Sequence, residues 1–144
     1  MNGWHVGASG NTHSVYVGRK KWVTEPLQSA AWIATTDVRY IDPATADPPN
    51  QTLRTLPKGA VIAWAVIYSP LSKSERPVQL DFAKAKRYAC CEEASIPAEY
   101  DLTGAGPHQA YSVIIRIYFG SPPNPHLRAE AQLALQHLRL PAPR

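Results

Sequence analysis

Two apolar runs constrain this chain more than any other feature of its sequence. They cover Val61–Tyr68 and Tyr111–Phe119, and both are rich in the β-branched and aromatic residues that favour strands. Residues that favour turns bound them, with Gly59 and Pro70 around the first run and Gly120 after the second. We therefore predict two central strands of a sheet. Because the runs are apolar on both faces, both faces of that sheet need cover.

The apolar runs are too short to cross a membrane. The longest uninterrupted stretch, Ala60–Tyr68, has nine residues, whereas a membrane-spanning helix needs about 20. Residues 1–4 also lack the basic and apolar regions of a secretory signal. We expect no membrane span, and either a cytoplasmic protein or a soluble piece of an exported one whose targeting segment is not part of this sequence.

The end of the chain predicts an amphipathic helix. Asn124 can cap it, and Pro125 suits the first helical position. Apolar residues then recur at helical spacing, at Leu127, Ala131, Ala134, Leu135 and Leu138. Pro141 stops the helix. Since its apolar stripe must be buried, we expect this helix to pack on the sheet.

Weaker patterns predict four further strands. They cover Ser14–Val23, Val38–Ile41, Val78–Phe82 and Glu99–Thr103. The last of them is followed by the turn-rich loop Gly104–Gln109, which favours a hairpin with the second apolar run. Pro26–Thr36 fits either a helix or the first half of a long strand. Asp42–Pro57 contains four prolines, which predict an ordered surface loop.

These segments predict a single α+β domain over residues 1–144, with no repeat or linker to divide it. We expect an antiparallel sheet of about five or six strands with the C-terminal helix packed on one face. A β-sandwich with an appended helix is the alternative. The other face would be covered by Pro26–Thr36, by a second sheet or by another chain, so a homodimer is one of three alternatives.

The two cysteines are the strongest candidates for catalysis. Cys90 and Cys91 are adjacent, and neighbours on a strand point to opposite faces, which disfavours a shared metal or a mutual disulfide. A cysteine-dependent enzyme or redox sensor would need one of them near a base such as His108. The flanking Glu92 and Glu93 disfavour a reactive thiolate. We predict no catalytic residue, metal or cofactor, and keep the cysteine enzyme as an alternative.

The charge of the chain does not favour nucleic-acid binding. The formal net charge is +4, from 15 Lys and Arg against 11 Asp and Glu, which is too small and dispersed for a basic footprint. The residues that could form one are Lys20, Lys21, Lys84, Lys86 and Arg87. Charge runs are mostly solvated surface, so single-stranded nucleic acid stays a further alternative.

Two loops and two tryptophans point instead to a protein partner. Function on small scaffolds tends to lie on long loops, here 42–57 and 104–109. Trp4 and Trp32 lie in mixed sequence contexts, and a partly exposed tryptophan is a common interaction anchor. We expect a non-enzymatic binding or accessory domain that engages a protein through these loops, with Trp4, Trp32 and His108 in contact.

The C-terminal end also resembles a known family. A strand that runs through a Pro-rich turn into a helix, closing with Ala-Leu-Gln-His-Leu-Arg-Leu at 134–140, is similar to the ending of PsbP-like domains. Several such domains are secreted or lipid-anchored proteins of high-GC bacteria, and the Arg-over-Lys bias with many Ala and Pro agrees with such a genome. The resemblance covers about a quarter of the chain and includes no catalytic motif. It implies an antiparallel sheet with helices and an accessory role outside the cytoplasm.

Overall fold

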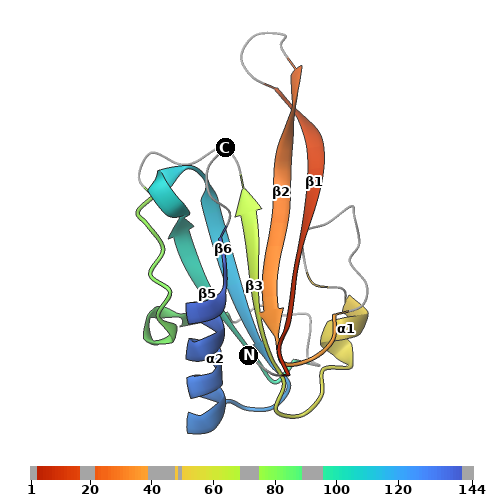
Figure 1. Cartoon of the computed structure of the whole chain (residues 1–144), viewed down its shortest axis with the longest axis vertical. Coiled ribbons are helices and arrows are strands. Elements are labelled where there is room, and N and C mark those ends of the chain that lie inside the picture. Colours follow the sequence, from red (N-terminus) through yellow and green to blue (C-terminus); the bar gives the residue numbers. More distant parts are fainter. Residues whose placement is uncertain are drawn as a thin grey trace.

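The computed structural model describes residues 3–16, 22–38, 48, 50–68, 75–88 and 96–140. One six-stranded antiparallel sheet, in the order β1-β2-β3-β6-β5-β4, carries a long helix on one face (Figure 1). The strands are β1 (His5–Tyr16), β2 (Trp22–Ala34), β3 (Val61–Tyr68), β4 (Lys86–Arg87), β5 (Ala98–Ala105) and β6 (Ser112–Phe119). The helices are α1 (Asn50–Arg54) and α2 (Pro125–His137), with 3-10 turns η1 (Phe82–Lys84) and η2 (Pro107–Gln109). The α+β prediction is confirmed, and the sandwich alternative is wrong for the described strands, because they form one sheet.

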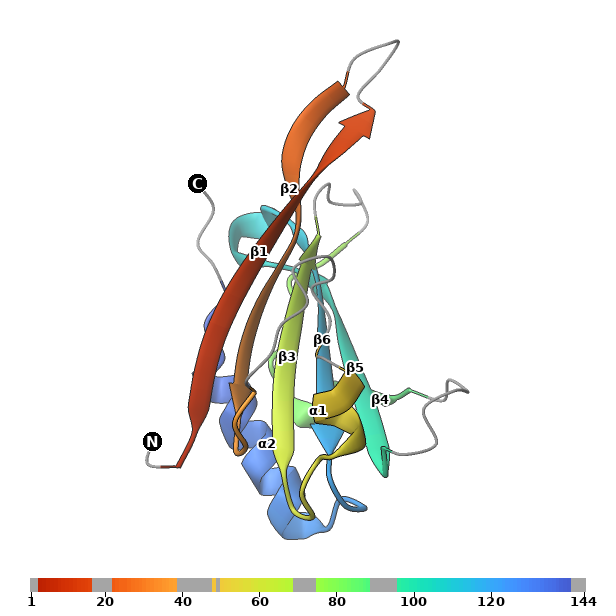
Figure 2. The same ribbon diagram turned by 90° about the vertical axis from the view of Figure 1, so that its right-hand side faces the viewer.

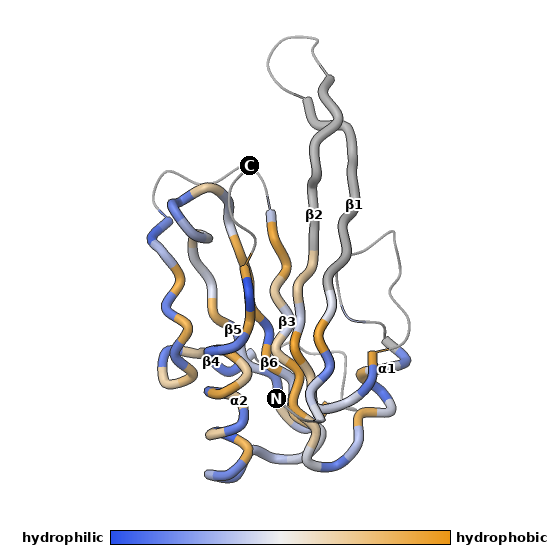
Figure 3. The backbone as a smooth tube through the Cα atoms, viewed as in Figure 1, coloured by the Kyte–Doolittle hydropathy of each residue, from blue (hydrophilic) through white to orange (hydrophobic). Residues whose placement is uncertain are grey.

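The two apolar runs form β3 and β6 at the centre of the sheet, as predicted. They pair in register from Val61 opposite Phe119 to Tyr68 opposite Ser112. Figure 3 shows hydrophobic residues along β3 and the neighbouring part of β2. The hairpin of β5 with β6 is confirmed as well. Within the described residues, neither helix has the length and the hydropathy that a membrane span requires.

Helix α2 covers one face of the sheet, as its apolar spacing predicts. Oδ1 of Asn124 accepts a hydrogen bond from the backbone N–H of Leu127 at 2.9 Å, which caps the helix. Its buried residues are Leu127, Ala131, Ala134 and Leu135. They join the odd-numbered residues of β3 and β6 in one apolar core.

The opposite face is covered in part by the chain itself. Trp64 of β3 stacks on Trp32 of β2, with ring centroids 4.5 Å apart and an interplanar angle of 10°. Leu53 of α1 packs on the same face with Ile62 and Tyr118. The proline-rich loop therefore contains a short helix that helps to bury the second apolar face.

Several weaker predictions need correction. Ser14–Val23 is not one strand, because β1 ends at Tyr16 and β2 begins at Trp22, with 17–21 outside the described residues. The segment Pro26–Thr36 belongs to the sheet, as the strand alternative predicted, since β2 runs through Ala34.

The remaining two strand predictions fall outside the sheet where the structure describes them. Val38 lies beyond the end of β2, and 39–41 is not among the described residues. The segment Val78–Phe82 is not a strand, because the chain turns there into η1 to bury Phe82.

The hairpin of β1 and β2 extends beyond the rest of the sheet (Figures 1 and 2). Of β2, only Gln28–Ala34 pairs with β3. The outer pairs, from Thr12 opposite Pro26 to Tyr16 opposite Trp22, join β1 and β2 alone among the described strands. We call these residues, 12–16 and 22–26, the arm.

Candidate functional site

The outer edge of β5 is covered at both ends and open in the middle. At one end β4 pairs with it opposite Asp101. At the other end the N–H of Val78 donates to the carbonyl of Ala105 at 2.9 Å, and the N–H of Ala105 donates to the carbonyl of Arg76 at 2.7 Å. Between these contacts, 102–104 has no strand partner at this edge among the described residues.

The interruption arises because the chain leaves β5 to bury Phe82. This side chain is 8% exposed, and its ring lies 5.1 Å from that of Tyr100 and 5.7 Å from that of Phe119. Gln132 of α2 holds the backbone there: its Oε1 accepts from the N–H of Phe82 at 2.7 Å, and its Nε2 donates to the carbonyl of Leu80 at 3.2 Å. The core under α2 thus draws the segment off the sheet edge.

A glycine permits the segment 76–78 to cross close to β5 at the Ala105 end. A Cβ on Gly104 would lie 2.8 Å from the carbonyl oxygen of Arg76 and 3.0 Å from backbone atoms of Val78. Real Cβ atoms do not approach backbone so closely, so any other residue would push the crossing segment away from β5. Gly104 therefore fixes one wall of the opening.

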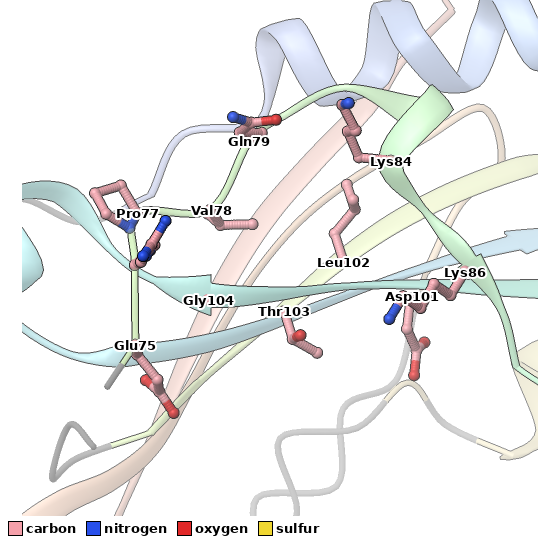
Figure 4. Close-up of a pocket in the computed structure, with 11 residues that line it drawn as sticks. Glu75, Pro77, Val78, Gln79, Lys84, Lys86, Asp101, Leu102, Thr103 and Gly104 are labelled. Carbon is pink, nitrogen blue, oxygen red and sulfur yellow. The ribbon is translucent and has the colours of Figure 1, made fainter. Parts of the chain in front are cut away.

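The opening is a pocket of about 500 Å³ (Figure 4). It is lined by Glu75, Arg76, Pro77, Val78, Gln79, Lys84, Lys86, Asp101, Leu102, Thr103 and Gly104. In Figure 4 the side chains of Lys84 and Leu102 lie on one side of the β5 ribbon, and those of Thr103 and Asp101 on the other. Its size falls within the usual range for sites that bind small groups, roughly 300–1,000 Å³.

Cations outnumber carboxylates in the lining of this pocket. Arg76, Lys84 and Lys86 contribute three positive charges, and Glu75 and Asp101 contribute two carboxylates. The carboxylate of Glu75 accepts a hydrogen bond from the hydroxyl of Ser112 in β6, which holds it at the side of β6. The lining therefore carries a small excess of positive charge, which favours an anionic ligand.

The second carboxylate, Asp101, is held inside the sheet between two cations. In register it lies opposite Lys86 of β4 and opposite Arg116 of β6. Burial raises the pKa of Asp101, and the positive charge of Arg116 opposes that rise. Its Oδ1 is buried without a hydrogen-bond partner among the described residues. Asp101 therefore belongs to the wall of the site, half withdrawn from solvent.

The residues predicted for function lie apart from one another. Trp4 is half-buried against the core under α2, and Trp32 is only 7% exposed because it stacks on Trp64. His108 is exposed in η2 with a φ of 57°, a left-handed conformation that is uncommon outside glycine. Cys90 and Cys91 lie outside the described residues, so the suggested pairing of a thiol with His108 stays a prediction.

The two loops predicted to form one binding edge lie at opposite ends of the sheet. The described part of 42–57 leads through α1 into the start of β3, beside the end of β6. The loop 104–109 connects the end of β5 to the start of β6 (Figure 1). Among the described residues of the two loops, Gly104 alone lines the pocket.

Sequence reasoning identified some residues of the pocket and missed others. Lys84 and Lys86 stand out in the sequence as a basic cluster, and Asp101 lies near a group of acidic residues, but Arg76 and Thr103 do not stand out. The one signal for these was Pro77, which disfavours a continuous strand and thus hints at an interrupted edge.

No protein-family model, curated protein or solved structure matches the chain. Within the described ranges, no group of three His, Cys, Asp or Glu side chains could hold a metal ion. A function for this chain is therefore inferred from the pocket itself.

Proposed function

We propose that this chain is a non-enzymatic binding domain that takes an extended, acidic segment of a partner protein at the outer edge of β5. The observation that carries the proposal is the interruption of pairing opposite Thr103, with a cationic pocket around it. A protein partner is also what the long loops of the sequence predict.

The interruption offers main-chain groups to an added strand. In an antiparallel strand, alternate residues direct their N–H and C=O to the same edge. Ala105 and Asp101 both pair at the outer edge of β5, so Thr103, midway between them, directs its main-chain groups to that edge too. Peptides that add to a sheet edge gain affinity from such main-chain hydrogen bonds.

The charged residues that line the pocket then favour one kind of side chain on the partner's added strand. Hydrogen bonds between ammonium or guanidinium groups and a carboxylate are roughly twice as strong as neutral ones. With Arg76, Lys84 and Lys86 around the opening, a glutamate or aspartate of the partner is favoured over a neutral residue. The covered ends of β5 limit the partner to a short extended segment, so side-chain charge contributes most of the selectivity.

Two expectations from the sequence agree with this proposal. The loop 104–109 begins at the pocket through Gly104, so its exposed residues, His108 among them, are placed to contact the flanks of a bound segment. The resemblance to PsbP-like domains implies an accessory role of this kind. A second copy of the chain is the other partner that the sequence predicts, and β1 rather than the pocket is the edge suited to it.

The proposal can be tested with synthetic peptides and the full chain. A capped peptide of alternating Val and Glu is titrated by calorimetry, beside the same peptide with Gln in place of Glu. We expect the Glu peptide to bind and the Gln peptide to bind at least tenfold more weakly. Lys84→Glu with Lys86→Glu should reduce binding of the Glu peptide by at least tenfold. Arg54→Glu with Lys58→Glu, at exposed positions beyond the pocket, is the matched control and should leave it unchanged.

Other outcomes would overturn the proposal. Equal binding of both peptides, no binding of either, or the same loss in the control variant would exclude an acidic segment at this pocket. Binding of an oligothymidylate that weakens steeply with salt, without peptide binding, would instead favour single-stranded nucleic acid on the same cations.

A further inference from the structure

We propose that the outer edge of β1 pairs with the same edge of a second copy of this chain, which forms a two-fold symmetric dimer with one continuous sheet. This interface is separate from the pocket, because β1 and β4 are the two ends of the strand order. It does not depend on the proposed function.

The edge of β1 lacks most of the usual protections against pairing, and its pairing with β2 shows one irregularity, a register shift between Asn11 and Thr12. Its twelve residues, His5–Tyr16, include no Lys, Arg, Asp, Glu or Pro. Edge strands of monomeric proteins are usually short, charged or interrupted by proline, since open edges template association. In a two-fold symmetric pair, any charge on the edge would lie close to an identical charge of the other copy and be repelled. A long neutral edge avoids this repulsion, so it suits a second copy in particular. The net charge of +4 lies elsewhere on the chain.

The length of the arm gives an independent reason for this partner. An isolated two-stranded hairpin is at best marginally stable in water. In a two-fold symmetric antiparallel pair, opposite residues share a face of the sheet. If the axis passes at residue 11 of β1, residues 12–16 of one copy therefore lie beside 6–10 of the other. Those residues belong to the body of the sheet, since β1 pairs there with the part of β2 that contacts β3. Each arm would thus be supported by the main sheet of the other copy.

A groove next to β1 adds to the interface. Val6 is 75% exposed, and it lines a groove of about 320 Å³ with Ala31, Ile33 and Leu138, between the hairpin and the end of α2. His137 and Arg139 also line this groove, so it is apolar only in part. A two-fold axis perpendicular to the sheet would place both grooves on the same face. A stable interface usually involves about 20–30 residues on each side, so β1 alone falls short and the groove residues are needed. We therefore expect a dimer of micromolar affinity.

Sedimentation equilibrium of the full chain tests this over a concentration range from low micromolar to near-millimolar. We expect the wild-type chain to shift from monomer to dimer. Val6→Lys should weaken dimerisation by at least tenfold, because it puts a charge at the edge. Leu133→Lys is the matched control, since Leu133 is also an exposed apolar residue, 38% exposed on α2, and it should leave the dissociation constant unchanged.

Hydrogen exchange on the wild-type chain gives a second readout that needs no variant. Amides of β1 should exchange more slowly at high concentration than at low concentration, while those of β4 should not change. A chain that stays monomeric throughout would overturn the proposal. Equal weakening by the two Lys variants, or concentration-dependent protection away from β1, would overturn it as well.

Discussion

Strand β1 is twelve residues long and carries no charged residue, whereas β4 at the opposite edge has two residues, both cationic. The β4 side has a second protecting feature, because Pro77 lies in the segment that crosses β5. Charged residues and prolines at an edge are both common ways of preventing edge-to-edge association. One edge of this sheet is thus blunted and the other is open.

The two edges differ in what we propose that each of them binds. On the β4 side, protection is incomplete, because the chain turns away to bury Phe82 and leaves the pocket opposite Thr103. We propose that this opening admits only a short segment of a partner and selects it by charge. On the β1 side nothing selects by charge, and the whole strand is available to a partner of matching length. The first arrangement suits a specific ligand and the second suits a copy of the same chain.

Phe82→Ala should have the largest effect on stability, and it should act on the β4 side of the sheet alone. The side chain anchors the segment that leaves β5, and removing a buried phenylalanine costs about 3–5 kcal/mol of unfolding free energy. Urea unfolding followed by circular dichroism measures the loss. The anchor lies far from β1 in the strand order, so dimerisation at low temperature should persist where the variant still folds.

Because Phe82→Ala could unfold a marginal domain, Phe82→Leu serves as its companion. It keeps most of the volume, and we expect it to cost less than about 1.5 kcal/mol. A loss below about 1 kcal/mol for Phe82→Ala, outside the range for a buried aromatic, would contradict its role as the anchor.

A smaller effect is expected from Gly104→Ala. The added Cβ would meet the backbone of Arg76 and Val78, and overpacking of this kind costs roughly 1–3 kcal/mol. It should also displace the pocket wall and abolish binding of the acidic peptide, as calorimetry would show. Gly59→Ala provides a contrast, since a Cβ there meets nothing within 4 Å although the φ of 77° strains it; it should destabilise without affecting the peptide. Unchanged peptide affinity in Gly104→Ala would remove Gly104 from the site.

The smallest effect should come from Asp101→Asn, and it depends on pH. Burial raises the pKa of Asp101 above the 3.8 of an exposed aspartate, so the folded chain binds the proton more readily than the unfolded chain. The ionised carboxylate therefore opposes folding above the folded-state pKa, and this penalty disappears as the pH falls through the window between the two values. Asp101→Asn should unfold at higher urea than wild type at neutral pH and at equal urea in acid. A pH-independent difference would contradict burial as the cause.

The sequence was sufficient to predict the centre of the fold. Apolar runs with clear stops gave β3 and β6, and helical spacing with a capping Asn124 gave α2. The periphery was harder because its pairing is not local. The segment Val78–Phe82 has strand-like residues, yet Phe82 gains more from the aromatic contacts under α2 than the segment gains from edge pairing.

The candidate site was harder to predict than the fold, for the same physical reason. Lys84 and Lys86 stand out as charges in the sequence, but nothing there brings Arg76 or Thr103 beside them. They meet because the segment 76–87 contacts β5 at two places, at Ala105 and through β4. Between these two places, a hydrogen bond to Gln132 of α2 holds the segment away from β5. Contacts so distant along the chain leave no local pattern in the sequence.

Backbone amide NMR of the full chain tests the central claim, that the two edges are open to different partners. Spectra are recorded over a concentration series, with and without the Val-Glu peptide. The amide of Thr103 and its neighbours should shift with the peptide and not with concentration, whereas the amides of β1 should shift with concentration and not with the peptide. If both edges respond to the same variable, or if neither responds to either, the two edges do not have different partners.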